Sequence, residues 1–272
     1  DTGLDFASST GDTVHACGHD AHTAMLVGAA RLLAARREDL PGRVRFMFQP
    51  GEEGSGGAAL MIDDGVVDGV DGAFAIHVAP NVPAGIVAWR SGPALASADE
   101  LEVVVTGRGG HASTPHWATD PVPAACELVL ALQAMVTRTV DVFDPAVLTI
   151  AQVTAGTTHN VIPETARLYG TLRAVSERTR RAVWERIRTV ADGIAAAHGC
   201  TATVEITQGY PVTVTDGAFV RFVAEVADGA LGGGRAYEMP APEMGAGGFS
   251  YVIHQLPSAT VLLGVSPAEH PN

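Results

Sequence analysis

Two adjacent carboxylates are the residues of this chain whose types and spacing best suit chemistry. Glu52 and Glu53 follow the run Arg43–Gln49 and the chain breakers Pro50 and Gly51. Neighbouring side chains point in different directions, so one carboxylate can ligate a metal ion while the other stays free as a base. The alternative for a bare pair of glutamates is a solvated loop, because charged residues are mostly exposed.

Donors of other types lie before and after this pair. Cys17 and His19 flank a glycine, His22 lies three residues further on, and His77 comes later in the chain. Cysteine and histidine in this density are a composition typical of metal sites. A lone histidine is more often a core residue, and Cys17 is also a candidate nucleophile. The companion carboxylates favour a metal site over thiol chemistry.

The elements that must position these donors have the pattern of an α/β unit. Apolar residues recur at helical spacing from His22 to about Arg37, and a short helix is predicted over 58–64. Alternation predicts a buried strand over 43–49 and a second over 71–78, with His77 at its exit. Open α/β sheets bind ligands at the carboxyl ends of their strands, where both donor groups would lie. A helix over 216–230 and a last buried strand over 258–265, followed by His270, complete this unit.

The pattern changes at about Ser97. The predicted order is strand 101–105, helix 120–139, strands 147–153 and 165–172, helix 177–198 and strand 201–207. This is the order of a split βαβ sandwich with an antiparallel sheet. We therefore expect 97–211 to form a domain inserted into a catalytic domain made of 1–96 and 212–272, with Tyr210-Pro211 as the return hinge. The glycine-rich loop 107–113 is a poor phosphate site because no Lys-Ser/Thr follows it.

Composition excludes several classes of partner. The chain has 272 residues, 47% hydrophobic and 17% charged, with a net charge of −13. The negative charge argues against nucleic acid and anionic membrane surfaces, and no apolar run has the length of a membrane span. Three cysteines without paired spacing favour a reducing cytoplasm. Both ends of the sequence look cut, which indicates a fragment.

Five motifs occur in an order that is specific as a set: 15–22 (HACGHDAH), 49–54 (QPGEEG), 75–77 (AIH), 109–113 (GGHAS) and 159–163 (HNVIP). With them the chain resembles, over nearly its whole length, the metal-dependent N-acyl-amino-acid amidohydrolases, hippurate hydrolases and auxin-conjugate hydrolases. These belong with the aminoacylases and glutamate carboxypeptidase-like metallopeptidases. The resemblance implies a zinc-exopeptidase-like α/β catalytic domain with an inserted ferredoxin-like α+β lid that also forms a homodimer.

The resemblance also implies roles for individual residues. Cys17 matches the ligand that bridges two divalent metal ions, and His19, Glu53 and His77 match further ligands. Glu52 matches the general base. Three lid residues have implied roles as well. His111 matches a histidine that reaches the partner subunit's site and polarises the scissile carbonyl, while Asn160 and Arg173 match substrate contacts, Arg173 through a carboxylate.

The sequence departs from the family pattern in three places. An earlier Asp-containing motif is absent. The last metal histidine normally follows the final strand, so this ligand is either His270 or a residue beyond Asn272. Gly247 and Gly248 stand where an acidic pair is usual, which puts hydrogen bonding near the site in doubt.

The expected reaction is hydrolysis of the amide bond of N-acyl-L-amino acids of the hippurate or N-acetyl type. A hydroxide held by two metal ions about 3.5–4 Å apart would attack the carbonyl, with Glu52 moving the proton. A thiolate ligand favours Zn, Mn, Co or Ni over Mg or Ca. The alternatives are a dipeptidase or deacetylase of another acylated metabolite, or a catalytically dead dimerising or binding paralogue. The acyl group, amino acid and native metal stay open.

Overall fold

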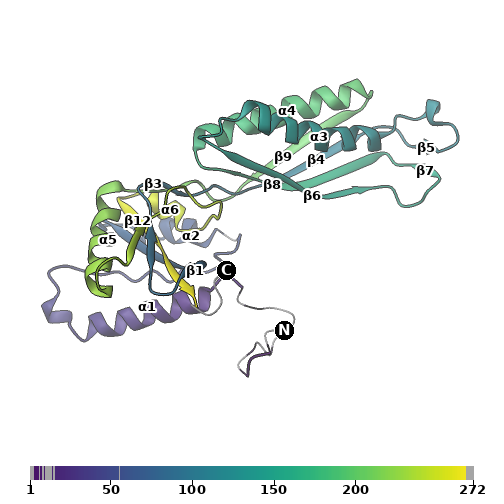
Figure 1. Cartoon of the computed structure of the whole chain (residues 1–272). Coiled ribbons are helices and arrows are strands. Elements are labelled where there is room, and N and C mark those ends of the chain that lie inside the picture. Colours follow the sequence, from purple (N-terminus) through teal and green to yellow (C-terminus); the bar gives the residue numbers. More distant parts are fainter. Residues whose placement is uncertain are drawn as a thin grey trace.

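The computed structural model describes residues 3–5, 7, 9, 14, 16–54 and 56–267. The chain has an α/β fold made of two bodies that lie side by side (Figure 1). One body holds both ends of the described chain and the parallel strands. The other, which we call the lid body, is an elongated sheet covered by two helices. Two chain connections join the bodies.

The first body is built on a mixed four-stranded sheet in the order β1-β12-β2-β11. The pairs β1–β12 and β11–β2 are parallel, and β12–β2 is antiparallel. A two-stranded sheet of β10 and β3 lies beside it. The elements of this body are α1 (His19–Ala34), η1 (Arg37–Asp39), α2 (Gly57–Asp63), β1 (Ala73–Pro83), β2 (Val87–Trp89), β3 (Gly92–Leu95), β10 (Thr213–Thr215), α5 (Gly217–Leu231), β11 (Ala236–Glu238), α6 (Ser250–Ile253) and β12 (Ser258–Ser266).

Helix α5 shows how local sequence sets these elements. Asp216 caps it by accepting the amide hydrogens of Ala218 and Phe219. Its buried face then packs through Val220 on Val261 of β12, within one hydrophobic cluster. The prediction for 216–230 is thus confirmed. Helix α1 begins at His19, three residues before the predicted start, and ends at Ala34.

The predicted buried strand over 43–49 is wrong. These residues belong to no strand, and Val44 and Phe48 are 51% and 45% exposed. The Arg45 guanidinium instead donates to the carbonyl oxygens of Gly65 and Val66. Alternation predicts which residues share a face, but a strand also needs a paired neighbour, and this segment has none among the described residues. Glu52 and Glu53 therefore follow an unpaired segment and not the end of a strand.

The lid body contains the split βαβ sandwich that the sequence predicts. Its antiparallel sheet has the order β6-β8-β4-β9, and α3 and α4 cover one face (Figure 1). Leu101, Val103 and Val105 of β4 are fully buried against these helices, as their alternation predicts. Its elements are β4 (Asp99–Thr106), β5 (Gly110–His111), η2 (Pro115–Trp117), α3 (Pro121–Thr139), β6 (Ala146–Ala155), β7 (Val161–Ile162), β8 (Thr165–Ala174), α4 (Glu177–Ala197) and β9 (Thr201–Gln208).

The two connections between the bodies are bonded to each other. Ala98 N–H, on the outgoing connection, donates to the Tyr210 carbonyl oxygen at 3.0 Å on the returning one. Gly209 N–H donates to Asp99 Oδ1 at 3.2 Å, and Asp99 is paired with the buried Arg180 of α4. We call residues 96–99 and 209–212 the junction. Its bonds tie the start of the lid sheet to the return of the chain.

A second polar cluster fastens the loop before β6 to the start of α4. Asp144 Oδ2 accepts hydrogen bonds from Ser176, Arg178 and Thr179 at 2.8, 2.8 and 2.7 Å. Burial acts to raise the pKa of Asp144, but these three donors outweigh it and hold the pKa below the ordinary value of 3.8. The Arg178 side chain is 80% exposed, so the ion pair between Arg178 and Asp144 adds little to the stability of the fold.

Asp144→Asn is expected to destabilise the chain by about 1 kcal/mol near neutral pH, because a carboxylate acceptor of three bonds is lost. A lowered pKa gives stability that is present above the unfolded value and is lost as pH falls through the folded value. The difference between the variant and the parent should therefore shrink below about pH 3.8. Urea unfolding at a series of pH values measures this difference in the free energy of unfolding. A difference that stays constant with pH would contradict the lowered pKa of Asp144.

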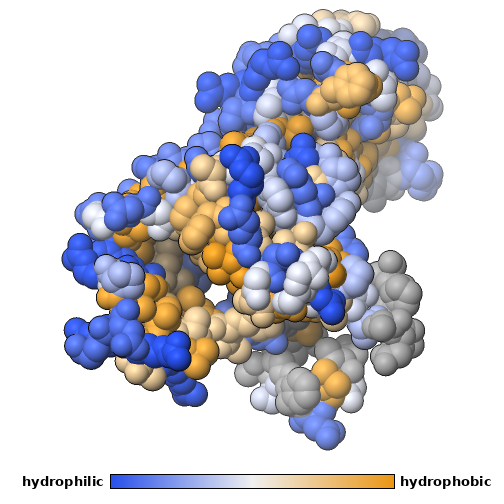
Figure 2. Space-filling view, turned by 60° about the vertical axis from the view of Figure 1, so that its left-hand side comes forward, coloured by the Kyte–Doolittle hydropathy of each residue, from blue (hydrophilic) through white to orange (hydrophobic). Residues whose placement is uncertain are grey.

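Hydrophobic side chains are also exposed on both bodies (Figure 2). Leu32 of α1 and Phe222 of α5 are 73% and 59% exposed on the first body, and Val153 of β6 is 54% exposed on the lid body. In the part of the chain that the structure describes, no helix combines the length and the apolar character that crossing a membrane requires.

Candidate metal centre

Gly18 creates the turn that brings Cys17 and His19 to one place. It has φ +82°, a left-handed conformation that side chains disfavour, and it precedes the first residue of α1. A Cβ at this position would also lie 2.4 Å from Val78 Cγ2 of β1. A glycine is therefore required both by the backbone and by the close approach of the turn to β1, which carries His77.

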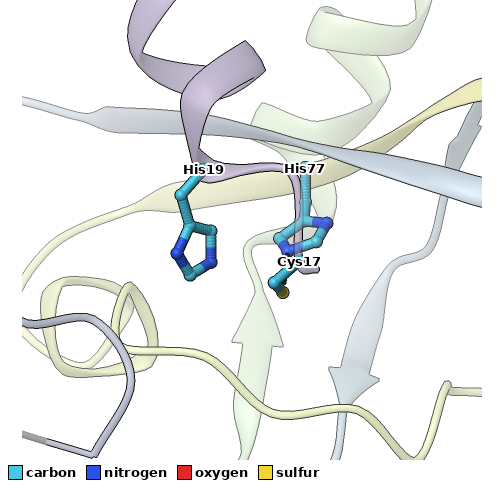
Figure 3. A group of neighbouring side chains, drawn as sticks. All are labelled: Cys17, His19 and His77. Atoms are coloured by element: carbon cyan, nitrogen blue, oxygen red, sulfur yellow. Dashed lines mark hydrogen bonds between the residues drawn. The ribbon is translucent and has the colours of Figure 1, made fainter. Parts of the chain in front are cut away.

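Cys17, His19 and His77 converge from the turn, from α1 and from β1 (Figure 3). Their ligand atoms lie within 4.8 Å of one another, and Cys17 Sγ is 3.4 Å from His77 Nε2. The Nδ1 of His77 lies 2.7 Å from the Val78 carbonyl oxygen, which accepts its hydrogen. This bond places the proton on Nδ1 and directs the lone pair of Nε2 at Cys17, the arrangement of a histidine ligand.

Glu52 and Glu53 form a second group with His19. The carboxylate oxygens nearest to His19 Nε2 are 3.4 Å away for Glu52 and 3.9 Å away for Glu53, and the three ligand atoms lie within 4.8 Å. The side chains of Glu52 and Glu53 are 26% and 74% exposed. The two carboxylates thus have different surroundings. Glu52 lies nearer to His19 than Glu53, the expected ligand, does.

The chemistry of this cluster fits divalent cations. His19 Nε2 is buried and makes no hydrogen bond, although two carboxylates lie within 4 Å of it. Burial, then the charges of Glu53 and Glu52, raise the pKa of the Cys17 thiol. A positive ion between these groups would satisfy the histidine nitrogen and stabilise the thiolate and both carboxylates. A raised pKa also argues against Cys17 as a nucleophile, since thiol reactivity needs the thiolate.

His22 has a structural role beside the donors. Its Nε2 accepts the Val78 amide hydrogen at 2.9 Å, and its ring packs against the His77 ring at 4.3 Å between centroids. Burial, helped by His77 and His19, lowers the pKa of His22 from 6.5 to about 4. The neutral imidazole therefore joins α1 to β1 through its hydrogen bond to Val78, and it packs against the His77 ring.

Sequence reasoning did not find two groups that hold Glu52. Gly248 N–H donates to Glu52 Oε1 at 2.8 Å, so a backbone amide supplies the hydrogen bonding that the missing acidic pair had put in doubt. The hydroxyl of Tyr210 bonds to the Glu52 carbonyl oxygen. A backbone donor leaves no trace in residue type. The sequence marks Tyr210 only as part of a predicted hinge, and no residue pattern links it to the carboxylate turn.

The lid residues fall into two places. His111 and Asn160 lie together, because β5 pairs with β7 and Ala112 N–H donates to the Asn160 carbonyl oxygen. This end of the lid body is the one remote from β1 (Figure 1). Arg173 lies at the opposite end of β8, where its Nη1 donates to the Met244 carbonyl oxygen at 2.8 Å. The structure thus brings Arg173 close to the segment that contacts Glu52, and His111 and Asn160 far from it. His270 lies outside the described residues.

Comparison with known proteins identifies the family of the chain. The family described as peptidase family M20/M25/M40 matches residues 1–272. An N-acetylcysteine deacetylase of Bacillus subtilis is 40% identical over 270 residues, which cover 98% of this chain and 70% of that protein. The Arabidopsis thaliana IAA-amino acid hydrolase ILR1-like 2 is also 40% identical, over 257 residues that cover 93% of this chain and 58% of that protein.

Solved structures share the fold. A putative aminohydrolase from methicillin-resistant Staphylococcus aureus has a TM-score of 0.87 at 33% identity, covering 98% of this chain and 68% of that one. A Bacillus subtilis protein described as a dinuclear metal binding peptidase of the M20 family has a TM-score of 0.80 at 36% identity, covering 100% and 70%. The chain spans between 58% and 70% of the curated relatives named above. The resemblance seen in the motifs is confirmed: this chain belongs to peptidase family M20/M25/M40, a family of hydrolases that cleave peptide and amide bonds.

Proposed function

We propose that this chain hydrolyses the amide bond of N-acyl-L-amino acids of the hippurate or N-acetyl type with two bound divalent metal ions. The observation that carries the proposal is the meeting of five donors in two groups that share His19, whose buried Nε2 makes no hydrogen bond. The names of relatives support the substrate class, because they include N-acetylcysteine deacetylase and N-acetyldiaminopimelate deacetylase. A structural relative is described as a dinuclear metal binding peptidase, which supports two ions.

Residues of this chain have distinct parts in that reaction. Cys17, His19, Glu53 and His77 would hold the ions, and their thiolate and imidazole groups favour Zn, Mn, Co or Ni. Bound divalent ions supply Lewis acidity for the scissile carbonyl and lower the pKa of water. Glu52, oriented through Oε1 by Gly248 N–H, takes the proton of the attacking water and returns it to the departing amine.

The first experiment is a chelation and reconstitution assay. Free amino acid released from N-acetyl- and N-benzoyl-amino acids is measured with added Zn, Mn, Co or Ni, then with chelator, then after return of the metal. We expect turnover that chelator abolishes and metal restores. Chelation should also lower the thermal midpoint of unfolding, because ligands that bind only the folded state stabilise it. Turnover that is insensitive to chelator would contradict the metal role.

The proposal also covers how the lid completes the site. We propose that 97–211 is an inserted lid domain between the two parts of a catalytic domain, 1–96 and 212–272, and that the lids of two copies form a homodimer. The lid sheet has two edges, β6 and β9, open to pairing with another chain. His111 is remote from the donors of its own chain, so polarisation of the carbonyl by His111 requires the partner subunit.

Mixing two inactive variants tests this arrangement. Glu52→Gln and His111→Ala each leave every homodimer without a complete site. After subunit exchange, the mixed dimer has one site with both groups, so roughly a quarter of all sites should regain activity. Recovery supports a shared site, whereas no recovery between subunits shown to exchange by mass spectrometry excludes it.

Arg173 is proposed to bind the substrate carboxylate, because its planar fork can pair with both oxygens. Arg173→Ala should raise KM by about 10-fold or more with a smaller effect on kcat. Arg167→Ala, which removes an exposed arginine of the same strand that pairs with Glu102, is the matched control. Unchanged kinetics in Arg173→Ala would exclude the role.

Adding dipeptides to the substrates of the first assay separates two alternatives. A preference for dipeptides would favour a peptidase, as the name thermostable carboxypeptidase of another relative suggests. Binding of metal without any turnover would favour an inactive paralogue.

The three free cysteines support a reducing compartment, and we propose the cytoplasm.

A further inference from the structure

The hydroxyl of Tyr210 bonds to the turn that carries the two carboxylates. It accepts the amide hydrogen of Gly54 at 2.7 Å and donates to the carbonyl oxygen of Glu52. The bonded groups are 156 and 158 residues away in sequence, so only the tertiary fold makes this contact. One phenol thus joins both ends of the Glu52–Gly54 turn to a distant part of the chain.

That distant part is the junction between the two bodies. Tyr210 lies between β9 and β10, and its carbonyl oxygen accepts the Ala98 amide hydrogen at 3.0 Å. Its ring packs edge-on against the Tyr251 ring, with centroids 6.1 Å apart at 76°. The Tyr251 hydroxyl donates to the Gly209 carbonyl oxygen at 3.3 Å. The backbone and the ring of Tyr210 are therefore both fixed at the junction, and its hydroxyl bonds to the carboxylate turn.

The turn is held from its other side as well. Gly248, just before α6, donates to the side chain of Glu52, whereas Tyr210 bonds to the backbone of the same residue. These two contacts constrain a carboxylate that lies 3.4 Å from His19 Nε2. Gly54 N–H also approaches the Glu52 carbonyl oxygen at 2.9 Å within the turn. Loss of the phenol would therefore keep the turn and release its tie to the junction.

We propose that Tyr210 is a positioning residue whose hydroxyl fixes the Glu52–Gly54 turn against the junction, so that the packing of the two bodies sets the position of Glu52 beside His19. The proposal rests on the proposed role of Glu52 as the base, but its structural part does not depend on that role. Small displacements of a catalytic group cost large factors in rate, about 10²-fold for about 1 Å.

Tyr210→Phe tests the proposal, because it removes the hydroxyl and keeps the ring that packs on Tyr251. Tyr251→Phe is the matched control, since it removes the other hydroxyl of the ring pair, which bonds to Gly209 and not to the turn. In the metal-free chain, hydrogen exchange of the peptide that contains the 52–54 turn is followed by mass spectrometry. In the metal-loaded chain, kcat, KM and bound metal are measured with N-acetyl-amino acids.

We expect Tyr210→Phe to accelerate amide exchange in the turn about 10-fold and to lower kcat by about 10- to 100-fold, with KM and metal content unchanged. Tyr251→Phe should resemble the parent chain. Unaltered exchange in Tyr210→Phe, equal effects of both variants, or faster exchange with an unchanged kcat would each overturn the proposal. If the parent chain has no turnover, the proposed function fails, and the exchange measurement still decides whether Tyr210 holds the turn.

Discussion

Glu52→Gln is expected to lower kcat by at least about 10³-fold and to leave the bound metal unchanged. The amide keeps the size of the side chain and an oxygen that can accept the Gly248 amide hydrogen. It cannot take a proton from water. The variant therefore removes the base and keeps its position. The measurement combines single-turnover kinetics, which isolate the chemical step, with metal analysis of the same sample.

Two controls give this result its meaning. Glu102→Gln removes a lid carboxylate that pairs with Arg167 on the open face of the sheet, and it should not change kcat. Glu53→Gln should lose metal, since Glu53 is the proposed ligand. The distances make this comparison necessary, because Glu52 lies nearer to His19 than Glu53 does. If Glu52→Gln loses metal and Glu53→Gln keeps it, the two roles are exchanged.

Asp99→Asn is expected to destabilise the lid body by about 3 kcal/mol. Asp99 and Arg180 form an ion pair whose side chains are 0% and 4% exposed. Asp99 also accepts hydrogen bonds from Trp184 Nε1 at 2.9 Å and from the Gly209 amide. The asparagine would leave the buried guanidinium with only Glu177 as a charged partner. Removing one carboxylate partner from a buried charge costs far more than the loss of an exposed pair.

Urea unfolding followed by tryptophan fluorescence measures this effect, because the Trp184 indole bonds directly to Asp99. Glu185→Gln is the control on the same helix, and it breaks an exposed pair with Arg188 at a cost of at most about 1 kcal/mol. Adding Arg180→Met to Asp99→Asn should return part of the lost stability, because it removes a buried charge that has lost one of its two carboxylate partners. A loss below about 1 kcal/mol in Asp99→Asn would show that the pair is not what holds the junction.

Much of the lid body follows from its sequence. Leu101, Val103 and Val105 alternate with polar residues, and the structure buries all three under the helices. The bounds of α3 and α4 lie within a residue or two of those predicted, because Asp120 and Ser176 cap them with side-chain oxygens. Alternation and capping act between neighbours in sequence, so residue types record them.

The segment before the carboxylates shows where this reasoning fails. Residues 43–49 alternate as a strand does, yet they pair with no strand in the described part of the chain. Pairing depends on a neighbour that alternation does not specify. The sequence also does not predict four short strands, β2, β3, β10 and β11, because three or four residues give too little periodicity to detect.

The sequence by itself determined the donor types, because Cys17, His19 and His77 with two glutamates are a metal-ligand set in any fold that brings them together. The tertiary structure decided how they meet. It buried His19 Nε2 without a hydrogen bond, and it gave the Glu52 turn its bonds to Tyr210 and Gly248. It also separated His111 from the donors of its own chain. These contacts join residues far apart in sequence, and several use backbone atoms that every residue carries, so only the packing of the whole chain specifies them.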